Sequence, residues 1–511
     1  MSDSSESAAE LTRALAALQA AGSVEVCEDG ERLAELAQFQ YEVREKGNAT
    51  FVHLWSEERN LVRRVLRVAE EAAGRLVLEV QRFGKSKPGR LEFSNAEQKP
   101  SGRATREKFR ARFRRLLLTQ FPDERVVSLT SAQDLEHSFS GSYTRGVLER
   151  GQTAWAVLGA SSAESAATVD AALTFGLLWL DWTRAHAGKR VIEGLRIILP
   201  EGSARVAAHR LQGVLASANV ELYELHEATW LLRRVDPRDA GNLQTWLTPQ
   251  REAEDTLAAA RDAVAKTKAL APDAIDAVVP PGTREVSLRF RGLEFARWKG
   301  GELRTGLSHE LRGKSKKRPA TLASLIKELD TFRHPRAADK NHPLYRAAAE
   351  RWMESLALAD ITTIDARLDP RHVYLQVPAL SASGADSVGA GRGVMDLLGV
   401  THEGRLAVIE LKASAEIHLA MQGMDYWLRV RWHLEQGDFQ RYGYFSGVKL
   451  QDKAPLLYLV APGFQFHPAT DTLLRYLLPE VECIRVGLNE DWRCGLKVVF
   501  RQEAVPDAAK N

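Results

Sequence analysis

Three charged residues interrupt two apolar runs in the C-terminal part of the sequence. The runs are Val394–Val400 and Leu406–Leu411, joined by a His-Glu-Gly turn, and this pattern predicts a β-hairpin with both faces buried. Asp396 lies in the first run, Glu410 in the second, and Lys412 directly after it. A buried charge costs several kcal/mol unless it is paired or binds a metal. These three side chains are therefore the first candidates for chemistry.

The spacing of these residues suits a metal-dependent site that cleaves phosphodiester bonds. Residues two apart in a strand share a face, so Glu410 and Lys412 project together, and Asp396 can bring its carboxylate alongside from the partner strand. Two carboxylates suit Mg²⁺ or Mn²⁺, and the backbone carbonyl of Leu411 can add a ligand. A lysine beside the cation can orient water and offset the charge of a phosphorane-like transition state. The alternative is a simple ion pair at the strand end.

This arrangement resembles the PD-(D/E)XK nuclease superfamily, whose signature is an acid on one strand and E-x-K on the next. Asp396 matches the first acid and Glu410-Leu411-Lys412 matches E-x-K, although Met395 stands where the signature has proline. The resemblance extends over about residues 344–501. It implies an α/β fold with a restriction-endonuclease-like mixed sheet flanked by helices. It also implies that Asp396 and Glu410 hold Mg²⁺ or Mn²⁺ while Lys412 assists the reaction.

Two neighbouring segments extend the resemblance. Gln422 and Tyr426 look like the Q-x-x-x-Y motif of RecB-like members, on the helix after the lysine, and would shape the site. Residues 350–354 look like the leading helix of NucS-type members, which often donates an acid, here Glu354. In the alternative interpretations, Gln422 and Tyr426 belong to a helix that simply covers the sheet, and Glu350 and Glu354 lie on a solvated helix face.

The hairpin needs supporting elements, and hydrophobic periodicity predicts an alternation of helices and strands around it. The predicted C-terminal elements are a helix over 344–358, a strand over 373–377, a Gly/Ser-rich loop over 381–393, the hairpin, a helix over 416–435, a strand over 456–460, a helix over 468–478, and strands near 483–486 and 496–501. The predicted N-terminal elements are helices over 8–45, 57–73 and 99–115, a strand over 75–81, and then strand 154–158, helix 163–186, strand 191–199, helix 203–218 and strand 220–225.

Similar segments recur in the same order in the two halves and predict an internal duplication. G-K-S-K occurs at 84–87 and 313–316, and R-G-V at 145–147 and 392–394. A-W-A-V-L-G-A-S at 154–161 matches A-V-I-E-L-K-A-S at 407–414, and L-R-I-I-L-P-E-G at 195–202 resembles L-L-Y-L-V-A-P-G at 456–463. The first copy has Leu158-Gly159 where the second has its E-x-K segment, so it is predicted to have lost the chemistry. Coincidence is the alternative.

The expected organisation is an N-terminal α/β half over 1–240, a helical linker over 241–282 and a C-terminal nuclease-like half over 283–511 with its core at 344–503. Basic clusters in both halves can neutralise nucleic-acid phosphates. The alternative for each cluster is a solvated face. The residues predicted to bind nucleic acid are Lys85, Lys87, Arg103, Arg106, Arg110, Arg114, Lys314, Lys316 and Lys317.

Composition limits the class of protein. The 511 residues carry a formal net charge of +3, too small to indicate a partner by itself. Three cysteines without C-x-x-C spacing argue against a zinc site or a disulfide framework and fit a reducing cytoplasm. The acidic N-terminus lacks the basic region of a signal peptide, and no apolar run is long enough to span a membrane.

The sequence thus predicts a cytoplasmic, metal-dependent nuclease that hydrolyses DNA, with RNA not excluded as substrate. The N-terminal half would be a DNA-binding or specificity module, and the protein would be a monomeric pseudo-dimer or a homodimer. Two alternatives stay open. One is a non-catalytic nucleic-acid-binding or scaffold protein that retains the fold. The other is a nuclease gated by a small ligand in the N-terminal half, although that half has no Gly-rich phosphate loop between residues 154 and 203.

Overall fold

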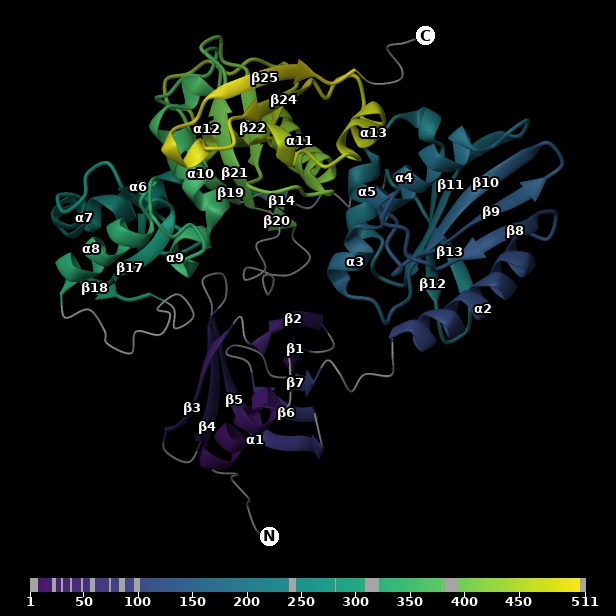
Figure 1. The fold of residues 1–511 in the computed structure, drawn as a ribbon, viewed down its shortest axis with the longest axis horizontal. Coiled ribbons are helices and arrows are strands. Elements are labelled where there is room, and N and C mark those ends of the chain that lie inside the picture. Colours follow the sequence, from purple (N-terminus) through teal and green to yellow (C-terminus); the bar gives the residue numbers. More distant parts are fainter. Residues whose placement is uncertain are drawn as a thin grey trace.

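The computed structural model shows a mixed α/β protein built from four sheets of four or more strands and one two-stranded pairing (Figure 1). It describes residues 8–20, 24–28, 31–36, 39–46, 49–55, 60–72, 75–81, 88–95, 102–238, 245–280, 282–307, 321–378, 380–381 and 394–505. In this part of the chain no helix is long and apolar enough to cross a membrane.

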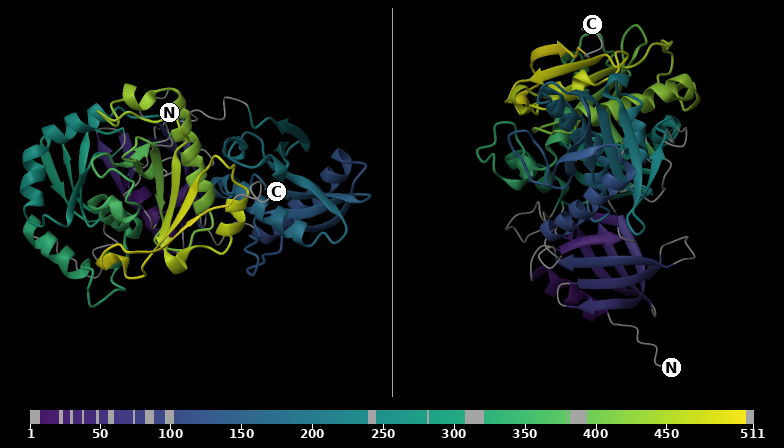
Figure 2. Two further views of the ribbon diagram at one scale, coloured as in Figure 1. Left: turned by 90° about the horizontal axis from the view of Figure 1, so that it is seen from above. Right: turned by 90° about the vertical axis from the view of Figure 1, so that its right-hand side faces the viewer.

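The N-terminal region is a seven-stranded antiparallel sheet with helix α1 (Ala8–Ala20) packed against it. Figure 2 shows this sheet below the rest of the molecule in its right-hand view. Leucines at positions 11, 15 and 18 of α1 are buried in its core. The strands are β1 (Val24–Glu28), β2 (Glu31–Glu35), β3 (Gln40–Lys46), β4 (Ala49–Trp55), β5 (Asn60–Ala72), β6 (Arg75–Gln81) and β7 (Gly89–Asn95), in the order β2-β1-β7-β6-β5-β4-β3.

Residues 102–238 form what we name the first α/β unit, a six-stranded sheet covered by helices on both faces. Helix α2 (Gly102–Gln120) packs on one face, and α3 (Ala166–Asp170), α4 (Ala172–Ala185) and α5 (Arg205–Leu211) lie on the other. The strands are β8 (Arg125–Thr130), β9 (Thr144–Arg150), β10 (Thr153–Gly159), β11 (Val191–Pro200), β12 (Val220–His226) and β13 (Leu231–Val235), in the order β13-β12-β11-β10-β9-β8.

A smaller region precedes the second half. Helices α6 (Gln250–Ala259), α7 (Arg261–Lys268) and α8 (Leu322–Phe332) accompany a four-stranded antiparallel sheet, in which α7 contacts β15. Val264 and Ala271 pack on its core, so residues 250–271 are part of this region and not the solvated connection expected from their composition. The strands are β15 (Ile275–Val278), β16 (Glu285–Phe290), β17 (Leu293–Lys299) and β18 (Glu302–Thr305).

Residues 343–505 form the second α/β unit, which carries the hairpin. Helices α9 (Pro343–Arg346) and α10 (Ala349–Ala359) lie on one face of its sheet, and α11 (Leu419–Glu435), α12 (Asp438–Arg441) and α13 (Thr470–Arg475) belong to the other side. The strands are β19 (Tyr374–Pro378), β21 (Val394–Val400), β22 (Leu406–Leu411), β23 (Leu456–Pro462), β24 (Cys483–Leu488) and β25 (Val498–Glu503), in that order in the sheet. The short strand β20 (Leu380–Ser381) pairs with β14 (Thr245–Trp246).

The two α/β units have the same sheet topology. In each, the first three strands pair antiparallel, the third pairs parallel with the fourth, the fourth pairs parallel with the fifth, and the fifth pairs antiparallel with the sixth. In each, the long helix on one face follows the third strand. Figure 1 shows α4, α5, α11 and α13 between the two sheets, where their side chains share one apolar core.

Most predicted strands and helices of the two α/β units are confirmed to within a few residues. The helix predicted over 203–218 ends at Leu211, the one predicted over 344–358 is split into α9 and α10, and two N-terminal helices are wrong. Only residues 8–20 of the helix predicted over 8–45 are helical, and strands follow. The helix predicted over 57–73 is strand β5. Leu61, Val65 and Val68 pack on the core of this sheet and are spaced like one face of a helix. The register shift between 65 and 67 explains this, because it places Val68 on the same strand face as Leu61 and Val65.

Candidate active site

The hairpin of β21 and β22 brings Asp396, Glu410 and Lys412 together. Leu397 pairs with Ile409, which places Asp396 opposite Glu410 across the two strands. The Asp396 carboxylate accepts a hydrogen bond of 2.8 Å from the backbone amide of Leu411. The Lys412 ammonium donates a hydrogen bond of 3.1 Å to Glu410. The three side chains predicted from sequence therefore form one cluster of two carboxylates and an ammonium.

The electrostatics of this cluster favour a cation. Burial, and then the charge of Glu354, raises the pKa of Asp396 well above its usual range. Burial and the charge of Asp396 raise the pKa of Glu410 in the same way. Burial alone would lower the pKa of Lys412, but the surrounding carboxylates raise it, so the ammonium stays charged. The cluster holds more negative than positive charge when its carboxylates are ionised.

Helix α10 supplies two further acids, in different environments. Glu354 is buried and accepts hydrogen bonds from Arg351 at 2.8 Å and from the Gln376 side chain at 3.1 Å. It is therefore not on a solvated helix face, and its carboxylate is held by two protein donors. Glu350 is about two-fifths exposed and lies 3.7 Å from the Lys412 ammonium. Glu350 is the acid of this helix that reaches the lysine, whereas Glu354 acts on Asp396 through its charge.

Helix α11 places Gln422 and Tyr426 on the other side of the cluster. The Gln422 amide donates to the Tyr426 hydroxyl at 3.3 Å. Burial and the nearby charge of Glu410 raise the pKa of Tyr426. The tyrosine therefore stays protonated and faces the acids. The helix packs on β22 and β23, and Gly423 permits the contact because a Cβ there would lie 2.7 Å from a Leu459 methyl.

The residues present fit a divalent cation in part. Oε2 of Glu410 is buried and has no hydrogen-bond partner in the described part of the chain. Buried polar atoms usually have a partner, so this oxygen is a candidate metal ligand. Asp396 is only partly buried, so the cluster is reachable from solvent. No group of three or more His, Cys, Asp or Glu side chains among the described residues converges to hold a metal. The side-chain ligands offered are two carboxylates, and the Leu411 carbonyl remains a prediction.

Sequence reasoning missed two residues that hold the cluster. Gln376 lies in β19 with a φ of 52°, and its side-chain oxygen accepts a hydrogen bond of 3.1 Å from Arg289 of β16. Arg289 is the residue that links the four-stranded sheet to the second α/β unit at this point. Neither residue has a sequence signal, because a glutamine in an apolar strand and an arginine in another sheet become neighbours only in the fold.

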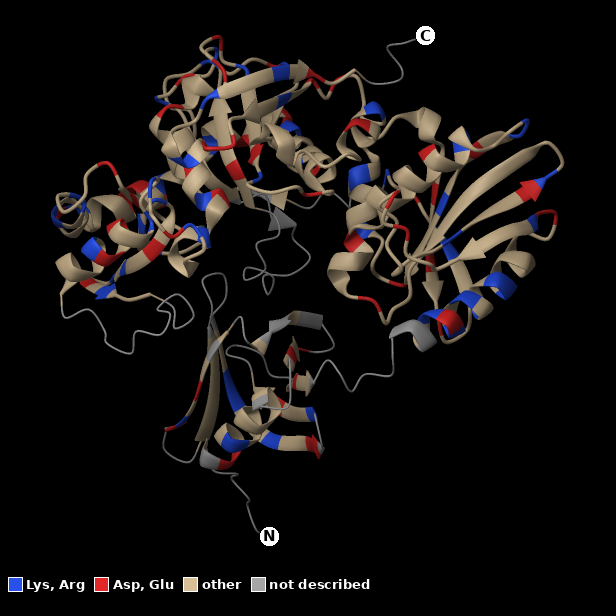
Figure 3. Ribbon diagram, in the orientation of Figure 1, with Lys and Arg blue, Asp and Glu red and all other residues tan. Residues whose placement is uncertain are grey.

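The structure describes the side chains of only some of the residues predicted to bind nucleic acid. Lys85, Lys87, Lys314, Lys316 and Lys317 lie outside the described residues, and the side chain of Arg103 is also outside them. Arg106 pairs with Glu164 at 2.7 Å, so its charge is already matched. Arg110 is half-buried and Arg114 is exposed. Figure 3 shows the basic residues along α2, where Arg112, Arg114 and Arg115 form the exposed basic face.

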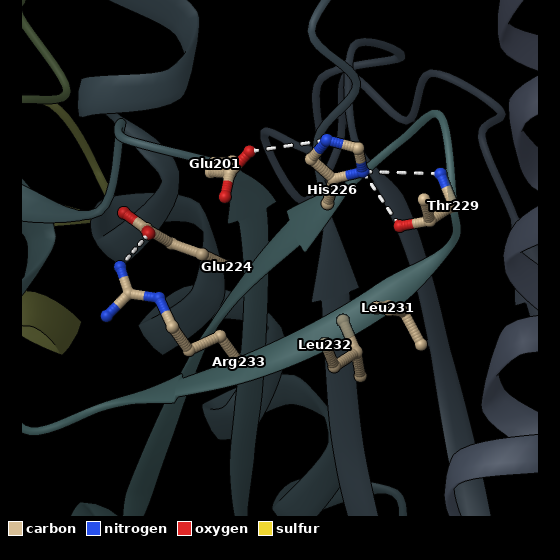
Figure 4. Close-up of a pocket in the computed structure, with 7 residues that line it drawn as sticks. All are labelled: Glu201, Glu224, His226, Thr229, Leu231, Leu232 and Arg233. Atoms are coloured by element: carbon tan, nitrogen blue, oxygen red, sulfur yellow. Dashed lines mark hydrogen bonds and ion pairs between the residues drawn. The ribbon is translucent and has the colours of Figure 1, made fainter.

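A cavity of about 310 Å³ lies in the first α/β unit, far from the cluster in the fold (Figure 4). Its polar groups are matched with one another: His226 contacts the Thr229 hydroxyl at 2.7 Å and lies 3.7 Å from Glu201, and Glu224 pairs with Arg233. The polar side chains that line the cavity thus pair with one another. The cavity therefore gives no support to the alternative of a nuclease gated by a small ligand.

Comparisons with protein-family models, with curated proteins and with solved structures found no match for this chain. The functional argument therefore depends on the geometry of the cluster.

Proposed function

We propose that the second α/β unit is a metal-dependent nuclease with a restriction-endonuclease-like sheet of the PD-(D/E)XK type. One observation carries the proposal: a buried carboxylate, Glu410, a partly buried one, Asp396, and a lysine converge at the end of a buried hairpin, and one oxygen of Glu410 has no hydrogen-bond partner among the described residues. A purely structural ion pair needs one acid for one base. Here Lys412 faces Glu350, Asp396 and Glu410 together, an excess of acid that a bound Mg²⁺ or Mn²⁺ would balance.

The roles follow from position. Asp396 and Glu410 would hold the cation, which when bound would lower the pKa of water and stabilise charge on the phosphate. Lys412 orients the attacking water and offsets negative charge in the transition state. Water oxygen bonds to phosphorus, the bridging P–O bond breaks, and the leaving alkoxide takes a proton, which gives a phosphomonoester and a hydroxyl. The charge of Glu354 raises the pKa of Asp396, and the hydroxyl of Tyr426, which accepts a hydrogen bond from Gln422, lies on the α11 side of the cluster.

DNA is the proposed substrate, with RNA as the alternative polymer, and the basic face of α2 supplies phosphate contacts. The rival function is a nucleic-acid-binding or scaffold protein that keeps the fold without activity. It predicts no metal binding at Asp396.

Metal binding separates the two functions. Titration calorimetry with Mn²⁺ is expected to show binding to the full chain that is lost in Asp396→Asn and in Glu410→Gln. The matched control Asp452→Asn, an exposed acid of the same unit, is expected to bind as the parent does. Equal Mn²⁺ binding by Asp396→Asn and the parent would count against the proposed site.

A further inference from the structure

The contact between the two α/β units has the form of a twofold dimer interface. Helix α11 of the second unit packs on α5 of the first, and α4 of the first packs on α13 of the second. Val214 and Leu477 form an antiparallel bridge at the centre. Each of these two residues lies six positions before the next parallel strand of its own unit (220 − 214 and 483 − 477). Equivalent positions therefore meet one another.

The hydrogen bonds at this bridge obey the same symmetry. The Leu215 amide donates to the Tyr476 carbonyl at 2.9 Å, and the Leu478 amide donates to the Gly213 carbonyl at 3.0 Å. Exchanging the two units converts one bond into the other. A contact in which the same patch of each partner meets itself is the isologous interface of a twofold dimer, here within one chain.

The helices that cover the two sheets, α4 and α11, are also equivalent in the way each packs on its own sheet. A Cβ at Gly176 of α4 would lie 2.9 Å from Leu195 and 3.1 Å from Ile197 of β11. A Cβ at Gly423 of α11 would likewise crowd two alternate leucines of β23. Both helices thus approach the corresponding strand of their own sheet through a glycine. This places Phe175 and Trp179 where the second unit has its glutamine and tyrosine.

The equivalent of the catalytic cluster can then be located in the first unit. The Ala160 amide bonds to the Ile198 carbonyl as the Lys412 amide bonds to the Val460 carbonyl, so Ala160 takes the position of the lysine. Two positions earlier, Leu158 takes the position of Glu410. This register differs by one residue from the match of the two segments that end at Ser161 and Ser414.

The third position is Arg145, which pairs with Leu158 as Asp396 faces Glu410. The Arg145 guanidinium is buried, and it stacks over Phe139 at 4.7 Å and Trp179 at 5.7 Å. R-G-V at 145–147 therefore aligns with residues from 396, not with the R-G-V at 392–394. The acid, acid and lysine of the second unit are an arginine, a leucine and an alanine in the first, so this site holds no cation.

From these equivalences we infer that the chain is an internal dimer with a single active centre, and that it cuts one strand of duplex DNA per encounter and leaves a nick. The twofold face of the second unit is covered by the first unit, which lacks the acids and the lysine, so this face is not open to a second catalytic unit that could cut the opposite strand. The inference rests on the proposed function, because it specifies the product of that reaction.

Supercoiled plasmid in excess over the full chain, with Mn²⁺, tests the product. Open circles are expected to accumulate until nearly all supercoiled DNA is consumed, with linear DNA appearing only afterwards. Linear DNA that appears from the start at the rate of open circles would overturn the inference and leave the proposed nuclease intact. Absence of any cleavage would overturn the nuclease itself, and the inference with it.

Mixing with inactive chains tests whether one active centre acts alone. With DNA in excess, the nicking rate per parent chain is expected to stay constant as Asp396→Asn chains are added. A rate per parent chain that falls in proportion to the inactive fraction would show that active centres pair between chains, and would contradict the internal dimer.

Discussion

At the scale of single residues, the site is defined by an excess of carboxylate over ammonium. Asp396 and Glu410 face one another across the hairpin, and only Lys412 and the Leu411 amide are bound to them by described hydrogen bonds. These residues could be predicted from sequence, because charges in an apolar hairpin are conspicuous. The burial of Glu354 could not be predicted. Its pair with Arg351 is local to α10, but its hydrogen bond from Gln376 depends on how α10 meets β19.

The raised pKa values of Asp396 and Glu410 predict how the metal-free protein responds to pH. A carboxyl whose pKa is raised by folding holds its proton longer in the folded than in the unfolded state. Its contribution to stability is present below the ordinary carboxyl pKa and is lost as pH rises through the raised value. These two carboxyls are therefore expected to contribute a decrease in melting temperature in a chelator as pH rises above about 4, and Mn²⁺ to reverse this contribution. Histidines whose pKa values are lowered by burial, His418, His433 and His467, contribute in the opposite direction, so the decrease is measured against a variant.

Asp396→Asn removes one of these ionisations. Thermal melts in chelator are expected to show a smaller decrease with rising pH for this variant than for the parent, while Asp452→Asn follows the parent. A pH dependence of Asp396→Asn identical to that of the parent would contradict the assigned carboxyl environment.

At the scale of elements, α11 brings Gln422 and Tyr426 to the candidate site because it lies directly on β22 and β23. Most elements of the two α/β units follow from hydrophobic periodicity, since long buried strands alternate with amphipathic helices. The N-terminal sheet could not be predicted in this way, because β5 has helix-forming residues and a register shift that gives its apolar residues helical spacing.

A methyl group at Gly423 tests the importance of this contact. Gly423→Ala is expected to cost about 1–3 kcal/mol of stability and to lower cleavage, because the helix must move away from Leu457 and Leu459 and carry Gln422 and Tyr426 with it. Gly176→Ala is the matched variant in the first unit, with a similar stability cost and no comparable loss of cleavage. Equal effects of the two variants on cleavage, after correction for the folded fraction, would refute a positional role for α11.

At the scale of the whole molecule, the unit that carries the cluster of Asp396, Glu410 and Lys412 is fused to a unit of the same sheet topology that lacks these residues. The repeated segments of the sequence indicate this arrangement, but their alignment is wrong by one residue in one strand and by four at Arg145. Strand pairing corrects both, since a slip of one residue exchanges the faces of a strand. The two units are also joined by a buried ion pair, 2.7 Å long, between His209 of α5 and Asp425 of α11.

The most direct measurement of the central claim is cleavage of DNA by Lys412→Ala. Plasmid, single-stranded circular and branched DNA are incubated with Mg²⁺ or Mn²⁺ and with the parent chain, Lys412→Ala or the control Lys449→Ala, whose lysine is exposed in the same unit. The parent and Lys449→Ala are expected to cleave at least one of these substrates at equal rates, and Lys412→Ala about a hundredfold more slowly, with unchanged DNA binding. Cleavage by Lys412→Ala at the parental rate, or no cleavage by the parent, would contradict the account.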